Sequence, residues 1–270
     1  MNKACILIPV YKQSPSKDEI TSITQTLHIL KKYDIFLVCP DSLDIKEYLS
    51  LSSDSDTVVL VSRFADAFFQ DIHGYNRLLL SLDFYLRFSN YNFMLISQPD
   101  AYVFRDELSY WCDKAFDFIG APLVGKYEDV VFSKAMRVGN GGFSLRNVQT
   151  AINFFYSKKN VFAPKQIAQR ISLWKKPWSR FFVWILMVLG WRNKPSSVAS
   201  EWKYNEDDFW SGLLTGTRYQ LKMPEISDAI RFSFERFPSE LYDMNHNQLP
   251  FGCHAWKKYQ YDAFWSQFIN

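Results

Sequence analysis

Short apolar runs and helix-like patterns alternate along the first hundred residues of the chain. Four runs of strand length are continuously apolar, which is typical of strands buried on both faces of a sheet. Two longer segments repeat apolar residues every three or four positions, which is typical of helices. The strands are expected at residues 4–10, 35–39, 57–61 and 93–97, and the helices at residues 18–32 and 74–88. This order predicts an α/β fold with a mainly parallel sheet, in which ligands bind at the carboxyl ends of the strands.

The second half of the chain has a less regular pattern. Residues 116–122 predict a short strand and a turn, residues 142–146 predict another strand, and residues 149–156 predict a helix. Residues 163–200 differ in composition from their surroundings. We interpret them as a helical insertion in a single domain that covers residues 1–270.

Within this insertion, residues 181–191 form an apolar run. The run has about half of the roughly 20 residues that are needed to span a bilayer. Basic residues and tryptophans bracket it on both sides, which is typical of an interfacial helix in the headgroup layer. A buried helix or a contact between two subunits would give the same pattern. We expect peripheral association with a membrane surface, and both alternatives stay open.

Composition and charge narrow the class of protein. A chain of 270 residues can bury a full core, and its 48% of hydrophobic residues excludes a disordered or fibrous protein. The net charge of +3 is too small to indicate nucleic acid as a partner. The four cysteines are far apart and form no CxxC pair, and no signal peptide precedes the first strand. We therefore expect buried thiols and a cytoplasmic protein.

The first polar cluster, Gln98-Pro99-Asp100, directly follows the fourth predicted strand. A carboxylate at this edge of a sheet could hold Mg²⁺ or Mn²⁺ against a diphosphate, because both ions prefer oxygen ligands. Asp100 could equally cap the turn that follows. The residues alone leave both interpretations open.

The second cluster is the segment Gly-Asn-Gly-Gly at residues 139–142. Three of its four positions have no side chain, so the backbone either approaches another group closely or adopts a positive φ. No Lys-Ser/Thr pair follows and no helix begins there, so the segment is neither a P-loop nor a dinucleotide fingerprint. It is either a tight turn or a floor of backbone N–H groups beneath a sugar or a diphosphate.

The third cluster is acidic and consists of Glu206, Asp207 and Asp208, which open a short helix predicted over residues 207–214. Adjacent like charges raise one another's pKa, and a carboxylate with a raised pKa is a useful general base. Acidic residues also stabilise a helix N-terminus without any catalytic role. Both interpretations stay open.

His254 lies near the C-terminus in a run of aromatic and turn-forming residues. A histidine in such a run requires a backbone partner, a metal or a bound anion. A lone histidine can be purely structural, so its interpretation depends on the three clusters upstream.

The order of these clusters resembles a bacterial and fungal family of proposed glycosyltransferases, the domain of unknown function DUF5672. The resemblance covers nearly the whole chain except the insertion. The matching segments are residues 74–79, 98–108, 110–112, 118–122, 138–146, 205–210 and 249–256.

More distantly, the chain resembles the GT-A glycosyltransferases, such as the β-1,4-galactosyltransferases. In those enzymes an Asp-x-Asp motif after a strand is followed by a glycine turn, an acidic run and a late metal-binding histidine. The matching residues, in chain order, are Asp100, Gly141, Gly142, Glu206, Asp207 and His254. Gln98 stands where the first Asp of the motif would be, which removes one charged metal ligand. The resemblance implies a GT-A-like, Rossmann-type mixed sheet.

The same resemblance implies an inverting hexosyltransferase that moves a sugar from a nucleotide-diphosphate sugar, with a UDP-sugar favoured, to a glycan or lipid-linked acceptor. It would act in O-antigen or capsule synthesis at the inner face of the cell membrane. Asp207 would be the general base with Asp208 as its rival, and Glu206 would orient hydroxyl groups. Asp100 and His254 would hold Mn²⁺ or Mg²⁺. The residues expected to bind the nucleotide sugar are Pro9, Val10, Tyr11, Tyr75, Asn76, Gln98, Asp100, Gly141 and Gly142.

Two other classes of protein stay open. A non-catalytic nucleotide- or carbohydrate-binding protein with the GT-A fold would explain Gln98, although the intact acidic run argues against it. A metal-dependent phosphate-ester hydrolase would need more clustered Asp and His ligands than the sequence offers.

Overall fold

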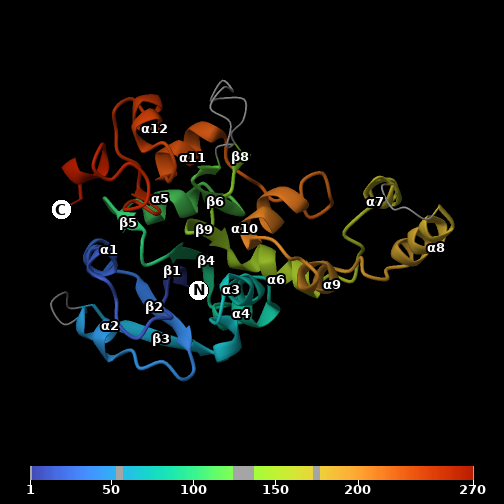
Figure 1. Ribbon diagram of the computed structural model, residues 1–270, viewed down its shortest axis with the longest axis horizontal. Helices are drawn as coiled ribbons and strands as arrows, with labels where there is room; N and C mark the ends of the chain where they lie inside the picture. Colours follow the sequence, from blue (N-terminus) through green and yellow to red (C-terminus); the bar gives the residue numbers. More distant parts are fainter. Residues whose placement is uncertain (1, 53–56, 124–136, 173–176, 270) are drawn as a thin grey trace.

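The computed structural model of the protein describes residues 2–52, 57–123, 137–172 and 177–269. Its centre is a six-stranded sheet with the order β3-β2-β1-β4-β9-β6 (Figure 1). The pairs β3–β2, β2–β1 and β1–β4 are parallel, and β9 is antiparallel to both β4 and β6. The strands are β1 (Asn2–Pro9), β2 (Asp34–Pro40), β3 (Val59–Phe64), β4 (Tyr91–Ser97), β6 (Phe118–Gly120) and β9 (Phe143–Asn147). This confirms the predicted α/β fold with a mixed, mainly parallel sheet.

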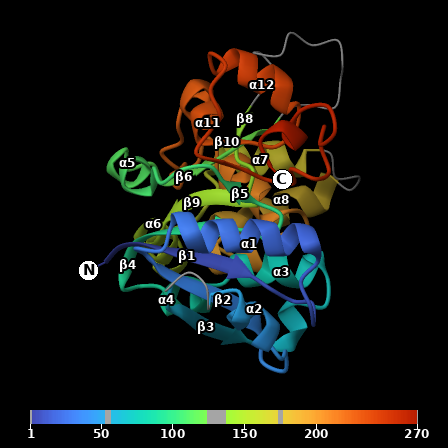
Figure 2. The same cartoon turned by 90° about the vertical axis from the view of Figure 1, so that its left-hand side faces the viewer.

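The central strand β1 is apolar from Ala4 to Pro9 because helices cover both faces of the sheet. Ile6 and Ile8 belong to the core cluster that contains the inner side of helix α1 (Lys17–Ile29). Cys5 and Leu7 alternate with them and belong to the cluster on the opposite face. The second cluster contains α3 (Ile72–Leu79), α4 (Leu82–Arg87) and α6 (Val148–Tyr156). Figure 2 shows α1 lying in front of β1, with α3 on the far side.

Smaller elements from the rest of the chain lie beyond β6 and β9, at the end of the molecule opposite to β3 (Figures 1 and 2). They include a three-stranded sheet with the order β10-β11-β5 and the pair β7–β8. Their bounds are β5 (Tyr102–Val103), α5 (Leu108–Asp113), β7 (Pro122–Leu123), β8 (Arg137–Val138), α11 (Ile226–Phe232), β10 (Ser233–Phe234), α12 (Pro238–Met244), β11 (Gly252–Cys253) and η4 (Trp265–Gln267). The pairing of β11 with β5 brings the C-terminal part of the chain next to the residues that follow β4.

Three helices lie in the segment that we interpret as an insertion: α7 (Pro164–Ile171), α8 (Pro177–Val188) and α9 (Pro195–Ser200). In Figure 1, α7 and α8 project from the side of the molecule. Among the described residues, no helix combines the length and the apolar character that a membrane crossing requires.

Several local predictions differ from the structure. The helix predicted over residues 74–88 is the two helices α3 and α4, because the Ser81 hydroxyl accepts the N–H of Phe84 and caps a new helix. Helix α2 (Lys46–Ser50) was not predicted, because Tyr48 is its one buried side chain and leaves no apolar periodicity. The acidic run forms α10 (Glu206–Asp208), which continues into the π-helix η3 (Phe209–Leu213), and a short 3₁₀-helix, η1 (Asp66–Phe68), precedes α3. The four cysteines are buried and free, as predicted.

Candidate active site

A cleft of about 500 Å³ opens at the carboxyl ends of β1 and β4. Ligands of α/β sheets bind at this edge. Five of the predicted ligand-binding residues line the cleft, and these are Pro9, Tyr11, Tyr75, Gln98 and Asp100. Its other lining residues are Lys12, Ser16, Asp18, Glu19, Phe69, Gln70, Asp71, Ile72, Pro99 and Lys257.

Four predicted ligand-binding residues lie outside the cleft lining, and these are Val10, Asn76, Gly141 and Gly142. Val10 is buried, with its side chain in the core beside α1. Asn76 is also buried, and its side-chain oxygen accepts the backbone N–H of Glu206 at 3.1 Å. The side chains of Val10 and Asn76 therefore pack or hydrogen-bond within the protein and do not face the cleft.

His254 lies next to the cleft, behind its lining residues Gln98 and Asp100, and contacts three polar side chains. Its Nε2 atom is 3.0 Å from Oε1 of Gln98 and 3.3 Å from Oδ1 of Asp100. Its Nδ1 atom is 3.2 Å from Oε1 of Glu235, which directly follows β10. The imidazole is thus held on both sides, and the two sequence clusters around residues 98–100 and 254 are in contact.

The two carboxylates determine the protonation of His254. Burial lowers the pKa of His254, but the hydrogen bonds and charges of Asp100 and Glu235 outweigh it and raise the pKa to about 10. For Asp100 the effects have the opposite sign. Burial raises the pKa of Asp100, but the hydrogen bond and charge of His254 outweigh burial and keep the pKa below its ordinary value. Near neutral pH the pair is therefore an imidazolium and a carboxylate.

The same atoms can be tested as ligands of a divalent cation. An octahedral ion with metal–ligand bonds of about 2.1 Å places neighbouring ligand atoms about 3 Å apart, close to the observed 3.0 and 3.3 Å from His254 to Gln98 and Asp100. Glu235 occupies the place of the outer carboxylate that commonly orients a metal-binding histidine. Within the described residues, no group of three or more His, Cys, Asp and Glu side chains could hold a metal. The site therefore fits a cation only if the neutral Gln98 oxygen serves as its third protein ligand.

The segment at residues 139–142, which we call the glycine turn, separates His254 from the acidic run at residues 206–208. A Cβ atom on Gly142 would lie 2.2 Å from Nε2 of His254, and one on Gly141 would lie 2.7 Å from Oε1 of Glu206. The N–H of Gly141 donates to Oδ2 of Asp207 at 3.2 Å, and that of Gly142 donates to Asn140 at 3.1 Å. Both N–H groups are thus engaged within the protein, so the turn acts as a spacer between side chains rather than as a floor of free donors beneath a diphosphate.

Glu206 forms a buried ion pair with Arg146 of strand β9. The two guanidinium nitrogens donate to the two carboxylate oxygens at 2.6 and 2.9 Å, and both side chains are about 95% buried. Arg146 also donates to the hydroxyl of Ser144 and to the carbonyl of Gly141. Burial lowers the pKa of Arg146, but the charge and hydrogen bonds of Glu206 contribute to a net increase. The pair fixes the start of α10 against the sheet and the glycine turn.

Asp207 and Asp208 have different surroundings. Burial raises the pKa of Asp207 above its ordinary value, and its two oxygens accept the N–H groups of Gly141 and Asp208. Asp208 is 35% exposed and forms an ion pair with Arg137 of β8. Asp207 is therefore the carboxylate whose environment favours accepting a proton.

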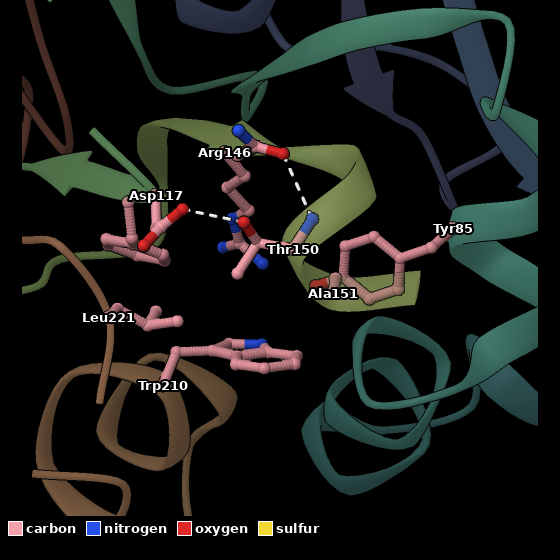
Figure 3. Close-up of a pocket in the computed structure, with 9 residues that line it drawn as sticks. Tyr85, Asp117, Arg146, Thr150, Ala151, Trp210 and Leu221 are labelled. Atoms are coloured by element: carbon pink, nitrogen blue, oxygen red, sulfur yellow. Dashed lines mark hydrogen bonds between the residues drawn. The ribbon is translucent and has the colours of Figure 1, made fainter. Parts of the chain in front are cut away.

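A second cavity lies behind Arg146 and is lined mainly by Tyr85, Asp117, Thr150 and Trp210 (Figure 3). Its volume of about 10 Å³ admits at most one water molecule. The hydroxyl of Thr150 donates to Asp117 at 2.6 Å across one side of it. This cavity is too small for a sugar or a nucleotide and is a packing feature of the sheet and α6.

Sequence reasoning missed two residues of this arrangement, Arg146 and Glu235. Arg146 had a detectable signal, because it is the one charged residue of a short strand and a buried charge requires a partner. Glu235 had none, because nothing in its local pattern separates it from a surface residue.

The described residues form an α/β fold with a candidate ligand cleft at the carboxyl edge of a mainly parallel sheet. Residues 59–254 match the model of a family described as "Protein of unknown function (DUF5672)", and the chain belongs to this family. The resemblance found in the sequence is thereby confirmed. A search of curated proteins found no match.

Three solved structures illustrate what the chain resembles. Core-mannan synthase A from Aspergillus fumigatus, in its Mn/GDP form, has 9% identity over 77% of this chain and 72% of its own, with a TM-score of 0.43. The glycosyltransferase GlyE from Streptococcus pneumoniae has 12% identity over 100% of this chain and 58% of its own, with a TM-score of 0.49. TarS from S. aureus in complex with UDP-GlcNAc has 14% identity over 55% of this chain and 46% of its own, with a TM-score of 0.35. The chain thus spans about half of the length of the last two.

Proposed function

We propose that this protein is a nucleotide-sugar-dependent glycosyltransferase of the GT-A type. The observation that carries the proposal is one connected polar cluster. It runs from Gln98 and Asp100 in the cleft, through His254 and the glycine turn, to the raised-pKa carboxylate of Asp207. A nucleotide-binding cleft beside a general base is what sugar transfer requires.

The donor would bind along the carboxyl edge of β1 and β4. Tyr11 is 56% exposed and lines the cleft, so its ring is available to stack on a nucleobase. Pro9 and Tyr75 line the same cleft, and Gln98 offers its amide to a ribose or phosphate group. A UDP-sugar remains the favoured donor.

The charge of the cleft supports a cation beside the diphosphate. Its lining contains the carboxylates of Asp18, Glu19, Asp71 and Asp100 but only two lysines, Lys12 and Lys257. A bound divalent ion, Mn²⁺ or Mg²⁺, would supply charge neutralisation of the diphosphate leaving group. Asp100 and His254 would hold it together with the Gln98 oxygen. His254 would have to be neutral to do so, while Glu235 keeps the ring oriented.

Asp207 would act as the general base. It accepts the proton of the acceptor hydroxyl as that oxygen attacks the anomeric carbon from the face opposite the diphosphate. The bond from the anomeric carbon to the diphosphate oxygen breaks, the nucleoside diphosphate leaves, and the configuration is inverted. Because Glu206 is paired with Arg146, its role would be to position Asp207 rather than to contact hydroxyl groups.

The proposal also includes the acceptor and the location of the protein in the cell. The acceptor would be a glycan or a lipid-linked sugar in surface polysaccharide synthesis, such as O-antigen or capsule. The protein would then work in the cytoplasm, at the inner face of the cell membrane, with residues 1–270 as one catalytic domain and residues 163–200 as its insertion.

A nucleotide panel tests the donor site. We expect UDP to raise the melting temperature more in the presence of Mn²⁺ than in its absence, and Tyr11→Ala to abolish the shift. Tyr156→Ala is the matched control, because Tyr156 is 57% exposed and does not line the cleft. If no nucleoside diphosphate changes the melting temperature, the cleft is not a donor site.

Turnover separates an enzyme from the alternative, a nucleotide- or carbohydrate-binding protein that has lost activity. An enzyme releases nucleoside diphosphate from a nucleotide sugar faster when an acceptor glycan is added. Binding without such release would establish the alternative.

A further inference from the structure

One face of helix α8 is apolar and exposed. The side chains of Trp178, Phe182, Leu186 and Leu189 are 86%, 65%, 44% and 76% exposed. They are spaced by four, four and three residues, so they lie on one side of the helix and of the turn that ends it. Phe181, at 62% exposed, widens this strip. We call these five residues the α8 face.

The opposite side of α8 is attached to the protein and fixes the direction of the α8 face. Val183, Trp184, Met187 and Val188 are partly buried and pack against the core. The indole N–H of Trp184 donates to the carbonyl of Pro164 at the start of α7, at 3.0 Å. The helix therefore presents the α8 face outward as part of a folded unit, and Figure 1 shows α7 and α8 at the edge of the molecule.

The sequence around this face is strongly basic. Residues 157–203 contain ten of the 31 Lys and Arg residues but only one of the 28 Asp and Glu residues, Glu201. The rest of the chain therefore has a net negative charge. A partner that meets the α8 face must match both its apolar side chains and the positive charge around it, and a bilayer containing anionic phospholipids does both.

A second copy of this chain fits less well. A symmetric dimer through the α8 face would bring two copies of residues 157–203 together, with like charges opposed. The aromatic residues also favour a bilayer, because tryptophans stand at both ends of the helical segment, Trp178 and Trp191, as is typical at the membrane–water interface.

We propose that the α8 face inserts into the surface of a bilayer that contains anionic phospholipids, with the basic residues of segment 157–203 binding the headgroups. This names the surface and the lipid class behind the membrane association in the proposed function. It does not depend on the chemistry in the cleft, so either proposal can fail without the other.

Vesicle sedimentation tests the proposal with the full chain. We expect binding to vesicles of phosphatidylcholine and phosphatidylglycerol in equal amounts, and much weaker binding to phosphatidylcholine alone or at high salt. The triple variant Trp178→Ser, Phe182→Ser, Leu189→Ser should bind about tenfold more weakly or worse. Lys165→Gln with Lys203→Gln, both exposed, should lose roughly tenfold. Val58→Ser is the matched control, because Val58 is 76% exposed and lies just before β3.

Three results would overturn the proposal. These are absence of wild-type binding to the anionic vesicles, unchanged binding of the triple variant, and equal binding to both lipid compositions. Light scattering after size exclusion tests the alternative that a second copy of the chain binds this face. If the wild type is a dimer and the triple variant is a monomer, the α8 face serves self-association instead. A cooperative thermal unfolding transition of the triple variant, with a melting temperature close to that of the wild type, confirms that the variant is folded.

Discussion

The candidate active site and the α8 face depart from ordinary burial in opposite directions. The site buries charged groups, with Arg146 and Glu206 almost completely removed from solvent. The α8 face exposes large apolar groups, with Trp178 and Leu189 mostly accessible. Charged side chains are rarely fully buried unless they are paired, and contiguous exposed apolar groups mark interaction surfaces.

The two regions therefore differ in how strongly their side chains are coupled to the rest of the fold. Each charged group of the site is held by a partner from a distant part of the chain, so a change there propagates through β9, the glycine turn and α10. The exposed side chains of the α8 face contribute little to the packing of the core. Changes at the site should therefore affect catalysis and stability together, whereas changes on the α8 face should affect membrane binding alone.

The largest expected effect is on turnover. Asp207→Asn keeps the size of the side chain and an oxygen for the Gly141 N–H but removes the base, so kcat should fall by about 10²–10⁴-fold. Steady-state release of nucleoside diphosphate measures it, and the UDP melting shift should persist. Asp208→Asn is the control, with a much smaller loss expected because Asp208 is paired with Arg137. Near-normal turnover in Asp207→Asn would remove Asp207 from the mechanism.

The next largest effect is on stability. Arg146→Ala leaves the Glu206 carboxylate buried without its partner, which should lower the free energy of unfolding by about 3–5 kcal/mol. The matched control is the exposed pair of Arg192 and Glu201, where Arg192→Ala should cost much less because solvent screens an exposed ion pair. Urea denaturation measures both variants. Equal losses in the two variants would mean that the Arg146 pair does not organise the site.

The pH dependence of turnover follows from the same burial. The pKa of Asp207 is raised above 3.8, chiefly by desolvation. The base is active when ionised, so kcat should be constant above this raised pKa and fall about tenfold per pH unit below it. A profile of log kcat against pH measures this. In Asp207→Asn the residual activity should lack that limb, and an unchanged limb would assign it to another group.

Much of the site could be predicted because strand ends are visible in the sequence. The continuous apolar runs of β1 and β4 located the carboxyl edge of the sheet, and with it Gln98 and Asp100. The family resemblance then selected Asp207 and His254. What local patterns could not supply is pairing: Arg146 meets Glu206 across 60 residues of sequence.

Two sequence interpretations show the same limit of local patterns. The resemblance implied that Val10, at the end of the first strand, contacts the nucleotide. The next residue, Tyr11, is the exposed one, because a shift of one position reverses the direction of a side chain. The sequence left open whether the glycine turn is a tight turn or a floor of free N–H groups; in the structure Asp207 and Asn140 accept the N–H groups of Gly141 and Gly142. Periodicity predicts which positions are apolar, whereas the partners of polar groups depend on how the elements pack.

The smallest expected effect on the fold comes from the α8 face and completes the comparison. Phe182→Ser should change the free energy of unfolding by no more than about 0.5 kcal/mol, because its ring is 65% exposed and contributes little to the core. Trp184→Ser, two residues away, should cost distinctly more, because the ring packs against the core and its N–H donates to Pro164. Urea denaturation of the two variants, with nucleoside diphosphate release for each, measures this contrast. A large loss of stability or turnover in Phe182→Ser would mean that the α8 face supports the catalytic domain itself, and the division between the two regions would fail.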